Sequence, residues 1–145
     1  MDGNIEILNF IYQNSEMGTE TIKHLIDITE KSTNEEFKNI LYSQYNEYNK
    51  IFKDSEKMIK DRGHDPKDIN KFQKITTYIM INMKTLTDKS PSHLSEMLIQ
   101  GSTMGVIDAT KRINQYDDAD KDVLELANKL LDFEKDNQEE WKKFL

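Results

Sequence analysis

The sequence of 145 residues contains no cysteine, only five glycines and only two prolines. The absence of cysteine excludes a disulfide framework, a thiolate metal site and a cysteine nucleophile. The scarcity of glycine and proline leaves few positions at which a helix has to end. No uninterrupted apolar run reaches about 18 residues, the length that a membrane-spanning helix needs. These absences favour a chain of long helices without covalent cross-links.

Positive charge is also in the minority. Lys and Arg total 20, whereas Asp and Glu total 27, which gives a formal net charge of -7. This acidic balance disfavours binding to nucleic-acid phosphates and to anionic lipid surfaces. The chain nevertheless has 36% hydrophobic residues, with six Tyr, six Phe and one Trp, which is more aromatic character than disordered chains carry. We expect residues 1–145 to form one domain around a single core.

The beginning of the sequence does not have the pattern of a targeting segment. Its first four residues are not basic, and Glu6, Asn9 and Gln13 interrupt the apolar run that a signal peptide requires. We therefore expect a cytoplasmic protein without membrane insertion.

Apolar residues recur at three- and four-residue steps, which is the period of amphipathic helices rather than strands. Caps and breakers mark the helix boundaries: Thr33-x-x-Glu36 has the pattern of a capping box, Gly63 is a stop signal, and Pro66 and Pro91 suit first-turn positions. The sequence thus predicts an all-α protein with five helices, at about 4–31, 34–62, 67–86, 91–113 and 119–143. The third helix spans about 30 Å, enough to carry the chain back along a bundle. The second and fourth helices would then be parallel, as in four-helix bundles with one crossover connection.

The four long helices each have an apolar stripe that becomes polar or small near its middle. At about 100° per residue, the stripe of the second helix is Phe37, Ile40, Leu41, Gln44, Tyr48, Ile51, Ser55 and Ile59. The stripe of the fourth helix is Leu94, Met97, Leu98, Gly101, Gly105 and Ala109.

Where the four stripes meet, they predict a central polar layer of Ser15, Gly18, Gln44, Ser102, Glu134 and Asn137. Such a layer is more often a packing feature than a reactive site. Glu134 is its only ionisable member at neutral pH. We expect this carboxyl group to take a proton or to accept hydrogen bonds from the Gln44 amide, a tyrosine hydroxyl or water.

The central layer also has the outline of a di-metal carboxylate site, which needs one Glu from each of two helices and Glu-x-x-His from the other two. The matching triplets here are Gln44-x-x-Glu47 and Glu134-x-x-Asn137, so most of the ligand types are missing. The three histidines, His24, His64 and His93, fall outside the inward mid-helix positions. The primary prediction is that there is no metal site, no other cofactor and no catalytic residue. An alternative hypothesis assigns iron or manganese to the ligands Glu16, Glu47, Glu134 and His24.

A family resemblance rests on five short segments: Leu8 with Ile11, Glu16-Met17-Gly18, Glu36-Phe37 through Leu41, Met83-Lys84-Thr85-Leu86, and Ile99-Gln100-Gly101-Ser102. Together they resemble the small bacterial ferritin-like domains, relatives of rubrerythrin and of the ferritin-like spore-coat proteins. The resemblance implies a ferritin-like four-helix bundle with an additional crossover helix between its second and third bundle helices. In metal-binding members of that superfamily, a Gly-Glu step on the third bundle helix supplies a ligand. The matching step here is Gly101-Ser102, and a hydroxyl does not replace a bridging carboxylate.

Two functional hypotheses follow. The first is a non-enzymatic bundle that acts through protein–protein contacts, with self-association as a homodimer through exposed Tyr78, Ile81 and Ile99; Val106 and Ile113 also lie off the main stripe. The second is a metal-dependent oxidase or metal-storage protein that uses the four alternative ligands.

Overall fold

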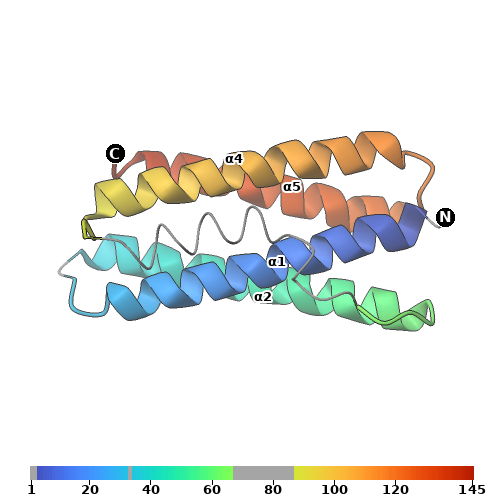
Figure 1. Ribbon diagram of the computed structural model, residues 1–145, viewed down its shortest axis with the longest axis horizontal. Coiled ribbons are helices and arrows are strands. Elements are labelled where there is room, and N and C mark those ends of the chain that lie inside the picture. Colours follow the sequence, from blue (N-terminus) through green and yellow to red (C-terminus); the bar gives the residue numbers. More distant parts are fainter. Residues whose placement is uncertain (1–2, 33, 67–86) are drawn as a thin grey trace.

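The computed structural model describes residues 3–32, 34–66 and 87–145, and every regular element in these residues is a helix. The helices are α1 (Gly3–Ile28), α2 (Glu35–Asp61), α4 (Pro91–Gln115) and α5 (Lys121–Lys142). They lie side by side as a four-helix bundle (Figure 1). The all-α prediction is confirmed, and the helix boundaries lie within a few residues of those expected. The helix expected at 67–86, which includes Tyr78 and Ile81, lies outside the described residues.

The directions of the helices can be followed in Figure 1. Helices α1 and α5 begin at the end of the bundle that holds the N-terminus, whereas α2 and α4 begin at the opposite end. Helices α2 and α4 are therefore parallel, which is the arrangement that the sequence predicted. The closest packing is between α1 and α2 and between α4 and α5, and contacts between these two helix pairs are sparser.

The helix starts are fixed by local side-chain hydrogen bonds. Asn34 caps α2, because its side-chain oxygen accepts a hydrogen bond of 3.0 Å from the Phe37 amide. The cap of α2 is therefore Asn34. Thr33, the first residue of the expected capping box, lies outside the described residues. Ser90 caps α4 in the expected way, with a proline in the first turn. Gly63, just after α2, has a φ of 76°, the left-handed conformation that a glycine tolerates best.

Helices α1, α2 and α5 supply most of the buried hydrophobic residues of the core. Seven of the eight predicted residues of α2 are buried, and the eighth, Ile40, is half-buried. On α5, Trp141 is fully buried and lies against Phe37, with a distance of 5.2 Å between the ring centroids. Phe144 packs edge-on against the same Phe37 ring at 5.2 Å. These aromatic contacts close the core at the end of the bundle where α2 begins.

Helix α4 is turned relative to the prediction. Leu94, Gly105 and Ala109 are buried as expected, but Met97, Leu98 and Gly101 are only half-buried. The off-stripe residues Ile99, Val106 and Ile113 are half-buried against the core, although Ile99 was expected to be exposed. The inward face is thus rotated by roughly 45° toward Ser95 and Ser102. The physical reason is that apolar residues occupy more than half of this helix's circumference, so its periodicity does not define one phase.

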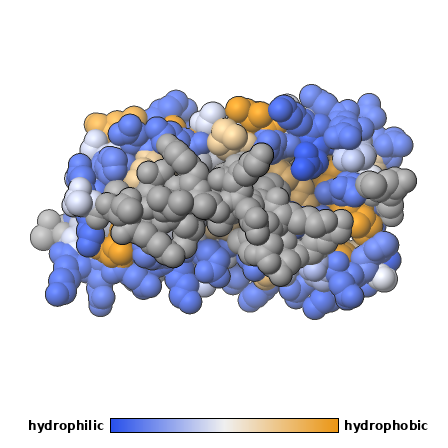
Figure 2. Space-filling view, in the orientation of Figure 1, coloured by the Kyte–Doolittle hydropathy of each residue, from blue (hydrophilic) through white to orange (hydrophobic). Residues whose placement is uncertain are grey.

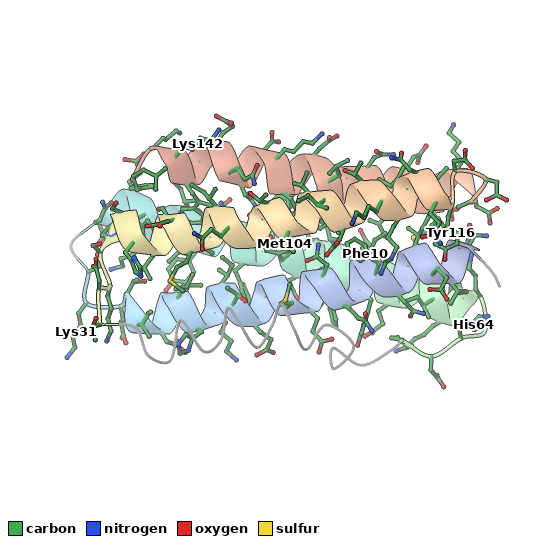
Figure 3. The ribbon with its side chains drawn as sticks, turned by 45° about the horizontal axis from the view of Figure 1, so that its top comes forward. Phe10, Lys31, His64, Met104, Tyr116 and Lys142 are labelled. Atoms are coloured by element: carbon green, nitrogen blue, oxygen red, sulfur yellow. The ribbon has the colours of Figure 1, made fainter. Side chains whose placement is uncertain are left out.

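Two contacts between the helix pairs lie toward the end of the bundle where α1 begins. Arg62, just after α2, pairs with Asp120 at 3.1 Å and with Asp122 at 3.3 Å. The Arg112 guanidinium of α4 lies over the Phe10 ring of α1, 5.2 Å from its centroid, in the region where Figure 3 shows Phe10 between these helices. Both contacts join helices from different pairs, and the second is a cation–π interaction.

Candidate functional site

The centre of the bundle contains the buried carboxylate of Glu134 on α5, which is 2% exposed. Its Oε1 atom accepts a hydrogen bond of 3.0 Å from the Asn14 amide nitrogen of α1. Its Oε2 atom accepts a hydrogen bond of 2.9 Å from the Tyr48 hydroxyl of α2. Three helices thus meet at this carboxylate, and both of its oxygen atoms have a neutral donor.

Two glycines provide the space that this arrangement occupies. A Cβ atom at Gly105 of α4 would lie 2.9 Å from Glu134 Oε1, and a Cβ atom at Gly18 of α1 would lie 2.6 Å from the Tyr48 ring. Such distances are shorter than van der Waals contact, so a side chain at either position would displace the carboxylate or the phenol. Gly105 therefore leaves room for the Glu134 carboxylate, and Gly18 leaves room for the Tyr48 ring.

Burial sets the electrostatics of this site. It raises the pKa of Glu134 from 4.5 to about 7, and the hydrogen bonds from Tyr48, Asn14 and Ser102 act in the opposite direction. Burial also raises the pKa of Tyr48 well above 10, and the neighbouring Glu134 raises it further. Near neutral pH the centre therefore holds either one proton or one negative charge on Glu134, while Tyr48 stays neutral.

A cavity of about 50 Å³ adjoins the carboxylate and is lined by residues of all four described helices. Its lining residues include the polar Glu134, Gln44 and Ser102 and the apolar Leu25, Leu98 and Trp141. The Gln44 side chain is buried, and its Nε2 atom has no hydrogen-bond partner among the described residues. The site thus combines a buried carboxylate, an unsatisfied amide and an apolar wall.

The predicted central layer is largely present. Five of its six residues are buried, and the sixth, Gly18, is half-buried beside Tyr48. The Ser15 hydroxyl donates to the Ile11 carbonyl of its own helix at 2.6 Å and so does not serve Glu134. The prediction of a tyrosine donor is confirmed by Tyr48, but the hydrogen bonds among the described residues do not include one from Gln44 to Glu134.

Sequence reasoning missed Asn14 as a direct partner of Glu134. Asn14 precedes the predicted inward residue Ser15, and it is 4% exposed. The signal available in the sequence was an asparagine directly next to an inward-facing residue. An amide buried at such a position requires a hydrogen-bond partner. Tyr48 was placed on the inward stripe of α2, but the residue that its hydroxyl would contact could not be identified from helical phase alone.

The alternative metal ligands are spread over different parts of the bundle. Glu47 lies toward the surface, with oxygen atoms 3.9 Å from Lys50 Nζ and 3.8 Å from Lys129 Nζ. Glu16 and His24 are half-buried on α1. Within residues 3–32, 34–66 and 87–145, no three His, Asp or Glu side chains gather where they could hold a metal ion.

The described part of the chain has no helix that is both long enough and apolar enough to cross a membrane. Comparisons with models of protein families, with curated proteins and with solved structures found no match to this chain.

Proposed function

We propose that the protein is a non-enzymatic, ferritin-like helical bundle that acts through protein–protein contacts, and that it pairs with a second copy of itself through the outer face of α4. The observation that carries this proposal is the exposure of two large apolar side chains in the middle of that helix. Met104 and Ile107 are each 43% exposed. At about 100° per residue, they point roughly 130° and 170° away from the mean direction of the buried residues of α4.

The surroundings of these two residues support a contact surface. Outside the grey atoms, Figure 2 shows a largely hydrophilic face with hydrophobic patches at several places, one of them on the upper edge, where α4 lies. Methionine adapts its shape to different partners, which suits a binding surface. A two-fold axis across α4 would bring the same patch of two copies together and remove it from water on both sides.

The chemistry of the bundle centre supports a role without catalysis. Glu134 is held by Asn14 and Tyr48, and the described residues contain no group of three or more His, Asp or Glu side chains that could hold a metal ion. Oxygen chemistry at a di-metal centre requires several anionic ligands around two ions. The ferritin-like architecture is therefore proposed as a scaffold.

The molar mass in solution tests the proposal. At a concentration of tens of micromolar, light scattering of the full chain should give twice the 17.1 kDa of one chain. The double substitution Met104→Lys with Ile107→Lys should give the monomer mass, because two charges would be buried in the contact. The matched control is Tyr42→Lys, which changes a 52% exposed apolar side chain on α2 and should leave the dimer intact. A monomer mass for the unchanged protein would contradict the proposal.

A further inference from the structure

The cavity beside Glu134 is large enough for more than one ordered water molecule. A buried water needs about 10–15 Å³ of this kind of volume, and the cavity has about 50 Å³. Its lining includes a polar side chain that is only 4% exposed and has an unsatisfied atom, the Nε2 of Gln44. Buried polar atoms are rarely left without a partner. As placed, the unsatisfied atom of Gln44 is a donor, and a half turn of its carboxamide puts the oxygen acceptor in the same position.

The charge of the lining favours a cation. Among the described residues that line the cavity, Glu134 alone can carry a charge near neutral pH. Its hydrogen-bond donors, Asn14 and Tyr48, are neutral, and the ion pairs of the described residues do not include it. A carboxylate buried without a cationic partner is costly. A positively charged group in the cavity would offset that cost, whereas a negatively charged one would increase it.

The shape and polarity of the lining favour an organic cation over a metal ion. One carboxylate with amide and hydroxyl oxygens supplies less negative charge than a divalent ion normally requires. Leu25 and Leu98 provide an aliphatic wall, and Trp141 provides an aromatic surface that attracts cations. The Gln44 carboxamide can exchange its oxygen and nitrogen by a half turn, so it can present an acceptor to an ammonium group.

We propose that the central cavity binds a small primary ammonium ion on a short aliphatic chain. The ammonium group donates hydrogen bonds to Glu134 and to the Gln44 amide oxygen. The aliphatic chain lies along Leu25, Leu98 and Trp141, which are apolar lining residues. The cavity is small, so the ligand has only a few non-hydrogen atoms and its dissociation constant is expected in about the millimolar range.

Butylammonium is the probe for this proposal, with butan-1-ol as the neutral analogue and butyrate as the anionic one. The single tryptophan of the chain, Trp141, lines the cavity and reports binding through its fluorescence. At about pH 8 and constant ionic strength, butylammonium should change this fluorescence in a saturable way and raise the melting temperature. Butan-1-ol should bind at least about tenfold more weakly and butyrate should not bind, because neither supplies a positive charge to Glu134.

Substitution of the carboxylate separates binding in the cavity from binding at the acidic surface. Glu134→Gln keeps the side-chain shape and should weaken butylammonium binding at least about tenfold. The matched control is Glu125→Gln on the same helix, which removes an exposed carboxylate and should leave the affinity unchanged. Saturation-transfer NMR on the unchanged protein provides a measurement that does not depend on any variant. Absence of saturable butylammonium binding, equal binding of butan-1-ol, or equal affinity of the Glu134→Gln variant would each overturn the proposal.

Discussion

Replacement of Glu134 by glutamine should change the pH dependence of stability more than the stability itself. The pKa of Glu134 rises from 4.5 to about 7 because the folded protein buries the carboxyl group. At about 1.4 kcal/mol per pH unit, the folded protein binds this proton about 3 kcal/mol more tightly than the unfolded chain does. Because the folded-state pKa is the higher one, this contribution is complete below about pH 4.5 and is lost as the pH rises through about 7.

The Glu134→Gln variant has no proton to lose at this position. Its free energy of unfolding, relative to that of the unchanged protein, should therefore increase by about 2–3 kcal/mol between about pH 5 and about pH 8.5. The amide keeps the shape of the carboxyl group, so the fold should be retained. Other carboxylates titrate in both proteins, and their contributions cancel in the difference.

Urea unfolding followed through Trp141 fluorescence at several pH values measures this difference. The Glu125→Gln variant is the control, because it removes one negative charge from an exposed position on the same helix. Its stability difference should stay within about 0.5 kcal/mol over the whole range. If the Glu134→Gln difference were equally constant, the carboxyl group would not be held in the buried environment described here.

Two further substitutions test the packing and the capping of the helices. Gly18→Ala should lower the free energy of unfolding by about 1–3 kcal/mol, because its Cβ would lie 2.6 Å from the Tyr48 ring; equal or greater stability in urea unfolding would contradict the position of that ring, since alanine is otherwise the better helix former. Asn34→Ala should cost about 1 kcal/mol through loss of the hydrogen bond to the Phe37 amide, whereas Asn34→Asp should retain most of the stability. Thermal unfolding measures both variants, and an Asn34→Ala variant as stable as the unchanged protein would show that the cap contributes nothing.

The helices could be predicted well from sequence where their amphipathicity is strong. On α2 the apolar residues fall on one face of the helix and the polar residues on the other, so the buried positions could be predicted from helical geometry. On α4 apolar residues surround much of the helix, and the choice of inward face depended on packing against α5 rather than on its own sequence. The rotation of α4 moved Val106 and Ile113 toward the core and left Met104 and Ile107 exposed.

The residue types at the centre could be predicted, but their pairing could not. Helical phase identified Gln44 and Glu134 as inward-facing polar residues, and both are buried. The choice of donor to the carboxylate depends on small rotations and shifts of whole helices, by less than one residue. In the structure, Asn14 and Tyr48 donate to Glu134 and Gln44 does not. Ser15 is buried in the central layer, but its hydroxyl does not serve Glu134. It donates instead to the carbonyl of Ile11, four residues earlier in the same helix, as helical serines can.

Metal content is the most direct test of a bundle centre that works without metal chemistry. The full chain, purified without chelators, would be analysed for iron and manganese before and after titration with ferrous iron and removal of the unbound metal. A centre in which Glu134 is held by Asn14 and Tyr48 predicts far less than one ion per chain, and the same value for the Glu134→Gln variant. About two ions of iron or manganese per chain, lost on substitution of Glu134, would contradict this account and favour an oxidase or metal-storage function.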